Sequence, residues 1–194
     1  MGKIVKAFLL TLLAFLLQTS AMQHLKVAGV AASLLAVNIA VITVSLGKKY
    51  AFGSSCVTGI LLEATTASVG GLYAVIYPVI AMVFAQFFAD MSDEKRERLM
   101  LRQSDGKKIR GDMNPHLRIP LCTLCITASL EIIFLIYVTL SGTDLSFRLV
   151  GRALLTVVYT GVLSLILMFP ARMILRMYGG PVRRAMIEEN GRER

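Results

Sequence analysis

Long apolar runs separated by charged residues dominate this chain. Six such runs cover residues 5–23, 27–47, 50–68, 70–89, 119–141 and 149–170. A run of about 20 apolar residues matches the thickness of a bilayer core at ~1.5 Å of rise per residue. Inside lipid, each backbone N–H must be paired within its own segment, so the runs predict helices. We therefore expect an all-α membrane protein with a six-transmembrane-helix bundle over residues 1–171.

Two boundaries of this layout need an argument. A single carboxylate, Glu63, interrupts residues 50–89, and Ser68-Val69-Gly70-Gly71 is a turn-forming sequence that divides this stretch into two spans. The first run also resembles a signal peptide, because Lys3 and Lys6 precede it and Thr19-Ser20-Ala21 could be a cleavage site. Cleavage there would leave five spans.

The orientation follows from the basic residues, since cytoplasmic loops accumulate Lys and Arg. With six spans and both termini cytoplasmic, all of the 21 Lys and Arg residues except Lys26, Arg148 and Arg152 lie inside. A cytoplasmic loop at 90–118 and a basic cytoplasmic tail at 172–194 carry most of them. The loop is either a docking surface for a cytoplasmic partner or a solvated connector whose charges fix the topology.

Composition agrees with this class. The chain is 56% hydrophobic and 17% charged, and its formal net charge is +9. A soluble domain has about 25% charged residues. The basic residues flank apolar runs, so topology accounts for them and a nucleic-acid interface is not expected. They should also attract anionic lipids at the cytoplasmic face.

Four polar residues within the expected spans are candidate site residues, because hydrocarbon makes each of them costly. Glu63 and Arg152 lie at matching depth toward the outer leaflet, which predicts an ion pair. Glu131 and Asn38 lie near the midplane, where they can share a hydrogen bond. Such groups either hold helices together or form a ligand or proton site.

Small residues predict where helices approach closely. Ala32 and Ala36 belong to a four-residue repeat on the second span, and Gly59 belongs to another on the third. Gly70 and Gly71 open the fourth span, and Pro78 should kink it.

Motifs of catalysis and metal binding do not emerge from the sequence. It has neither an HExxH helix nor a phosphate-binding glycine loop nor a GxSxG turn. Cys122 and Cys125 have CxxC spacing but lie in an apolar run, where small core residues are expected. We expect no enzyme activity, no cofactor and no metal.

Four patches resemble the rod shape-determining MreD family, small polytopic subunits of the bacterial cell-elongation machinery. They are Leu12–Gln18, Val27–Val30, Gly59–Glu63 and Gly70–Ala74. The third patch is the most specific, since the family typically has a glycine, two leucines and an acidic residue there. This chain departs from the family in three ways: it lacks the family's Pro-Asp at the start of the second span, its loop between spans four and five is longer, and its basic tail is more developed.

The resemblance implies a non-catalytic scaffold in the bacterial cytoplasmic membrane. It would bind the single-pass protein MreC and so link peptidoglycan synthases to the actin-like protein MreB. The six-span layout of this family is also similar to the substrate-capture subunits of energy-coupling-factor vitamin transporters. In that alternative, Glu63, Arg152 and Glu131 would line an outward-facing pocket.

Overall fold

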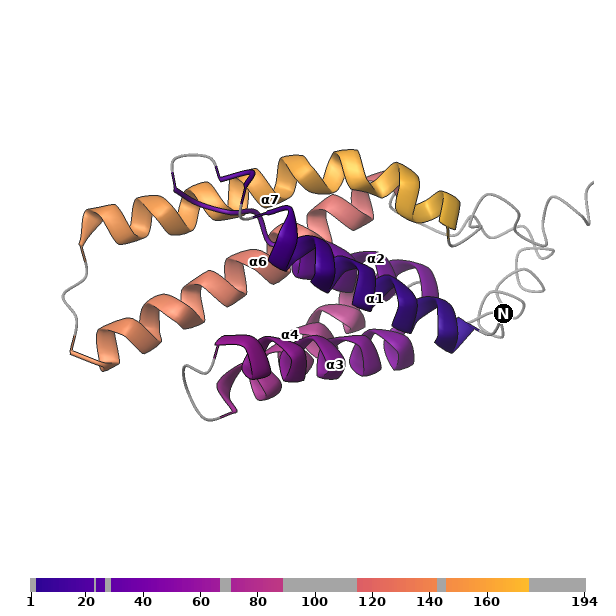
Figure 1. Cartoon of the computed structure of the whole chain (residues 1–194), viewed down its shortest axis with the longest axis horizontal. Coiled ribbons are helices and arrows are strands. Elements are labelled where there is room, and N and C mark those ends of the chain that lie inside the picture. The colour runs from indigo at the N-terminus through magenta and orange to yellow at the C-terminus, as the bar shows by residue number, and fades with distance from the viewer. Residues whose placement is uncertain are drawn as a thin grey trace, which may run out of the picture.

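The computed structural model describes residues 3–22, 24–26, 29–66, 71–88, 115–142 and 146–174. Within these residues all regular structure is helical (Figure 1). The helices are α1 (Lys3–Ser20), α2 (Leu34–Leu46), α3 (Lys48–Thr66), α4 (Leu72–Phe88), α6 (Pro115–Leu140) and α7 (Phe147–Ile174). The expectation of an all-α chain is thereby confirmed. Most of the loop predicted at 90–118, and the tail from 175 onward, lie outside the described residues.

Two helices are long and apolar enough to cross a membrane. They cover Leu117–Leu140 within α6 and Phe147–Ala171 within α7. Shorter apolar helices cover Ile4–Ser20, Leu34–Leu46 and Leu72–Phe88.

The central helix of the bundle is α2, which contacts each of the other five helices. All of its side chains from Leu34 to Val44 are buried. Apolar residues lie on every side of α2, as expected for a helix that is surrounded by other helices. The helices α3 and α4 form one hairpin beside it and α6 and α7 another, so the two hairpins enclose α2 together with α1 (Figure 1).

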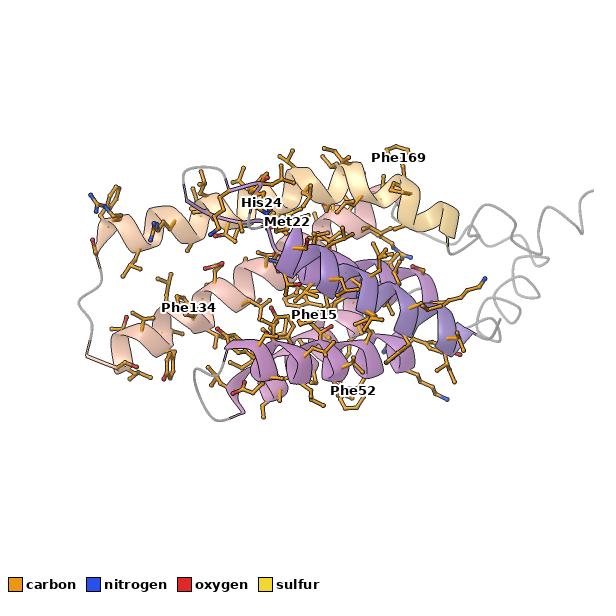
Figure 2. The ribbon with its side chains drawn as sticks, in the orientation of Figure 1. Phe15, Met22, His24, Phe52, Phe134 and Phe169 are labelled. Carbon is orange, nitrogen blue, oxygen red and sulfur yellow. The ribbon has the colours of Figure 1, made fainter. Side chains whose placement is uncertain are left out.

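The interior of this bundle contains both apolar and small polar side chains, and many large apolar side chains are exposed on its surface. The buried polar side chains are those of Thr11, Asn38, Thr43, Ser54, Ser55, Thr58, Thr123, Thr127, Thr160 and Ser164. Several hydroxyls donate to the carbonyl one turn earlier in their own helix, for example Thr123 Oγ1 to the Ile119 carbonyl at 2.9 Å. Phe52 and Phe169 point away from the bundle on opposite sides (Figure 2). So many exposed large apolar side chains are unusual for a water-soluble fold.

The second helix begins later than the sequence predicts. The apolar run 27–47 was expected to be one span, but α2 has only 13 residues and begins at Leu34. Gly29 has a φ of 78°, a left-handed conformation that favours glycine, and residues 30–33 are not helical. The side chain of Ser33 accepts a hydrogen bond from the Ala36 N–H, which is the geometry of a helix N-cap.

Distant residues complete the start of α2. Gln18 Oε1 in α1 accepts a hydrogen bond from the Leu34 N–H at 2.7 Å. Thr160 Oγ1 in α7 accepts one from the Ser33 N–H at 3.0 Å. The first N–H groups of a helix have no partner within the helix, so these two side chains supply the hydrogen-bond acceptors that a preceding helical turn would have provided. Residues 30–33 are thus buried or half-buried, with Ala31 and Ala32 packed beside α7, without being helical.

Candidate functional site

Glu63 closes the turn between α3 and α4. Its Oε1 accepts a hydrogen bond from the Gly71 N–H at 2.8 Å, and its Oε2 accepts one from the Tyr73 N–H at 3.2 Å. Both donors lie at the N-terminus of α4, where the helix dipole favours a negative charge. Gly71 has a φ of 88°, which permits the turn that brings its N–H toward the carboxylate. Glu63 is therefore a helix cap supplied by the preceding helix.

The predicted ion pair between Glu63 and Arg152 is wrong for this structure. The Glu63 carboxylate faces the α4 N-terminus, whereas the Arg152 guanidinium lies over Gly29, 3.4 Å from where a Cβ on that glycine would be. The prediction rested on matching depth along the spans, and depth does not specify which side of a helix faces which neighbour. Among the described residues, the Arg152 side chain has neither a hydrogen-bond nor an ion-pair partner.

Asn38 has a different partner from the one expected. Its Nδ2 donates to Thr11 Oγ1 at 3.2 Å, and Thr11 Oγ1 lies 2.8 Å from Ser54 Oγ. These three residues join α1, α2 and α3. The Oδ1 of Asn38 is buried and has no hydrogen-bond partner within the described part of the chain. The expected hydrogen bond between Asn38 and Glu131 is not formed.

The helices α3 and α4 approach closely at Gly59. A Cβ added there would lie 2.6 Å from the Tyr73 carbonyl oxygen and 2.9 Å from Ala74 Cα. Only a glycine lets the backbones of α3 and α4 approach to this distance. Ala32 and Ala36 are fully buried, and Pro78 lies buried within α4. Gly70 lies outside the described residues.

Glu131 lies where two cavities meet. A cavity of about 280 Å³ extends along α4 and α6, and another of about 400 Å³ lies between α6, α7 and residues 29–31. Glu131 and Phe134 line both of them. Arg152 and Thr156 line the larger cavity, with the Thr156 side chain beside the Glu131 carboxyl. The structure thus brings Glu131 and Arg152 to one cavity and leaves Glu63 and Asn38 elsewhere.

Sequence reasoning missed four polar residues that hold the helices in place: Thr11, Gln18, Ser54 and Thr160. Their hydroxyl and amide groups look ordinary in an apolar run, and their partners lie on other helices. A polar residue repeated at the same depth in several spans is the only sequence signal that could have pointed to them.

Comparisons of this chain with protein-family models, with curated proteins and with solved structures give no match. Its function is therefore inferred from the residues and contacts described above.

Proposed function

We propose that this chain is a multi-pass protein of the bacterial cytoplasmic membrane, with all six helices crossing the bilayer. The support is the outward display of large apolar side chains on helices whose buried faces carry hydroxyls. On α1, for example, Phe8, Leu13 and Leu16 are exposed while Thr11 is buried. Such a surface would be insoluble in water but is the natural one in lipid.

The 13 residues of α2 make a helix of about 20 Å, shorter than the ~30 Å hydrocarbon core. The non-helical residues 29–33 extend it toward the outer side. Irregular backbone at membrane depth is tolerated where protein covers it or where it lines a cavity. Ala32 and Val30 are buried, and residues 29–31 line the larger cavity, so this segment meets that condition.

Within that membrane we propose a non-catalytic scaffold of the cell-elongation complex, which helps determine rod shape and supports lateral peptidoglycan synthesis. One observation carries the proposal. The two patches that most resemble the MreD family, around Gly59–Glu63 and Gly71–Ala74, contact each other: Gly59 meets Tyr73 and Ala74, and Glu63 caps Gly71 and Tyr73. The spacing of this motif therefore has a physical basis as one rigid α3–α4 hairpin.

The partner of such a scaffold would be an MreC-like single-pass membrane protein, which would connect it indirectly to MreB and to peptidoglycan synthases. Anionic lipids would bind at the cytoplasmic face, where Lys48 and Lys49 are exposed at the start of α3. A partner helix could pack on any of the exposed apolar faces.

Depletion in the native bacterium, with cell shape followed by microscopy, tests this function. Loss of the protein should round or swell the cells, and the wild-type gene should restore rods. The variant Glu63→Ala should restore shape less well because it removes the α4 cap, whereas Ile60→Ala, an exposed position on the same helix, should restore it fully. Membrane abundance of both variants is measured by immunoblot. Rod-shaped cells after full depletion would reject the scaffold role.

The cavities beside Glu131 favour a second candidate, a substrate-capture subunit of an energy-coupling-factor-type vitamin transporter. Their polar lining includes Arg152 and Thr156, and the larger volume is within the range of small-molecule sites. A pull-down from detergent separates the two candidates. An MreC-like protein should be recovered with the scaffold, whereas an ATPase module would be recovered with the transporter subunit, and depletion would then create a vitamin requirement without a change of shape.

A further inference from the structure

Both cavities beside Glu131 are lined mainly by apolar groups, but only the lining of the larger one contains a cationic side chain, that of Arg152. Thr156 and residues 29–31 also line the larger cavity. The smaller one is lined mainly by apolar side chains of α4 and α6, among them Leu72, Ile76, Leu130 and Ile133. Glu131 and Phe134 line both cavities, so the two cavities are adjacent.

The part of the larger cavity at Arg152 requires a negatively charged or hydrogen-bonding occupant. The Arg152 guanidinium has no partner among the described residues, although five N–H donors make it costly to leave unpaired near lipid. It lies over Gly29, whose lack of a side chain leaves the guanidinium face of the cavity open. A phosphate matches this fork of donors better than any other common membrane group.

The positions of the cavity residues along α6 and α7 give the order in which they lie inward from the α6–α7 end of the bundle. Arg152 lies five residues after the start of α7, about 8 Å inward from that end, where a snorkelling guanidinium meets lipid phosphates. Thr156 lies one turn further along α7, beside the Glu131 carboxyl. Glu131 lies nine residues before the end of α6, about 14 Å inward, which is near the middle of a ~30 Å core. Thr127, which lines the smaller cavity, lies one turn further inward on α6.

We propose that the two adjacent cavities hold one phospholipid of the outer leaflet, with its phosphate on Arg152, its glycerol region between Arg152 and Thr156, and one acyl chain that passes Glu131 and lies between α4 and α6. The bound lipid fills the space between the two hairpins and so supports the outer half of the bundle. The site rests on the membrane placement proposed above and is independent of the scaffold role. A soluble organophosphate would share the contact with Arg152 but would leave the apolar cavity empty.

Native mass spectrometry of the protein in detergent tests the site with phosphatidylglycerol as the probe. The wild type should bind one molecule tightly. Arg152→Ala should weaken this binding about tenfold, the effect of losing one charge-assisted contact. Arg148→Ala is the matched control, because Arg148 is an exposed arginine one turn nearer the start of α7 and does not line the cavity. Equal binding by the two variants would overturn the proposal.

A second pair of variants tests the apolar half. Phe134→Trp enlarges a side chain that lines both cavities, and it should reduce binding, whereas Ile132→Trp, an exposed position on the same helix, should not. Circular dichroism and gel filtration show whether each variant is folded. Glycerol 3-phosphate is added as a competitor at concentrations that do not aggregate the lipid. If it displaces phosphatidylglycerol, the headgroup alone is recognised, and this result would overturn the lipid assignment. None of these readouts depends on cell shape, so the scaffold proposal can fail separately.

Discussion

Thr11 joins three helices through one hydroxyl. It donates to the Ala7 carbonyl or to Ser54 Oγ, each 2.8 Å away, and it accepts from Asn38 Nδ2 at 3.2 Å. The residue is only 1% exposed, so water cannot replace a lost partner easily. The orphan Oδ1 of Asn38 lies in the same group, which makes Thr11 the main attachment of that side chain to α1.

Replacing Thr11 by Val should therefore lower stability by about 1 kcal/mol, the typical range for a polar contact between helices in lipid. The shape of the side chain is kept, so the loss would come from the hydrogen bonds to Asn38 and Ser54. Thr19→Val is the control, since Thr19 is exposed on the same helix and bonds only to carbonyls within α1. Thermal unfolding in detergent measures both. A Thr11→Val protein as stable as Thr19→Val would mean that this contact carries little of the packing.

At the scale of elements, the charges and glycines that bound most apolar runs allowed five of the six helices to be placed from the sequence. Lys48 and Lys49 begin α3, and positive-φ glycines lie at the turns before α4 and after α6. The start of α2 has no such marker. The hydrogen-bond acceptors for the N–H groups at the start of α2 come from Gln18 and Thr160, which lie on helices that become adjacent to α2 only after folding. Sequence reasoning therefore began this span too early, at residue 27 instead of Leu34.

The α3–α4 hairpin allows a direct test of close packing. Gly59→Ala would place a Cβ 2.6 Å from the Tyr73 carbonyl, so the helices must separate. Overpacking of this kind costs roughly 1–3 kcal/mol. In Gly53→Ala the same change on the same helix meets no atom within 4 Å, and alanine favours helix over glycine.

Thermal unfolding should therefore rank Gly53→Ala at or above the wild type and Gly59→Ala below it. Equal melting temperatures for the two variants would show that the hairpin adjusts without strain and would remove the physical basis given above for the motif spacing.

At the scale of the whole molecule, the candidate site depends on proximity that no segment encodes alone. The larger cavity combines residues 29–31 with side chains of α6 and α7. The sequence identified Glu131 and Arg152 as costly groups in apolar runs, and the structure brings both to this cavity. The sequence did not predict that Glu63 accepts hydrogen bonds within the α3–α4 hairpin or that Asn38 donates one to α1. The rotation of each helix about its axis is set by packing against all of its neighbours at once.

The arrangement of the helix ends in the whole molecule allows a test of the proposed membrane topology. In Figure 1 the beginning of α1, the α2–α3 junction, the beginning of α6 and the end of α7 lie toward one end of the bundle, and the α6–α7 connection lies at the other. In the proposed topology, the first end would lie in the cytoplasm, because Lys6, Lys48 and Lys49 lie there and cytoplasmic segments accumulate basic residues. A cysteine at Phe147, which is 93% exposed at the start of α7, should then react with a membrane-impermeant maleimide in intact cells.

A cysteine at Lys49 should react only after the membrane is permeabilised, because six crossings place the start of α3 and the start of α7 on opposite sides. The background for both variants replaces Cys56, Cys122 and Cys125, and Lys48 is kept so that the local charge still favours the cytoplasm. Labelling of Lys49→Cys in intact cells together with Phe147→Cys would contradict six crossings. The result matters for the lipid site as well, because Arg152 can meet an outer-leaflet phosphate only if Phe147 faces the outside.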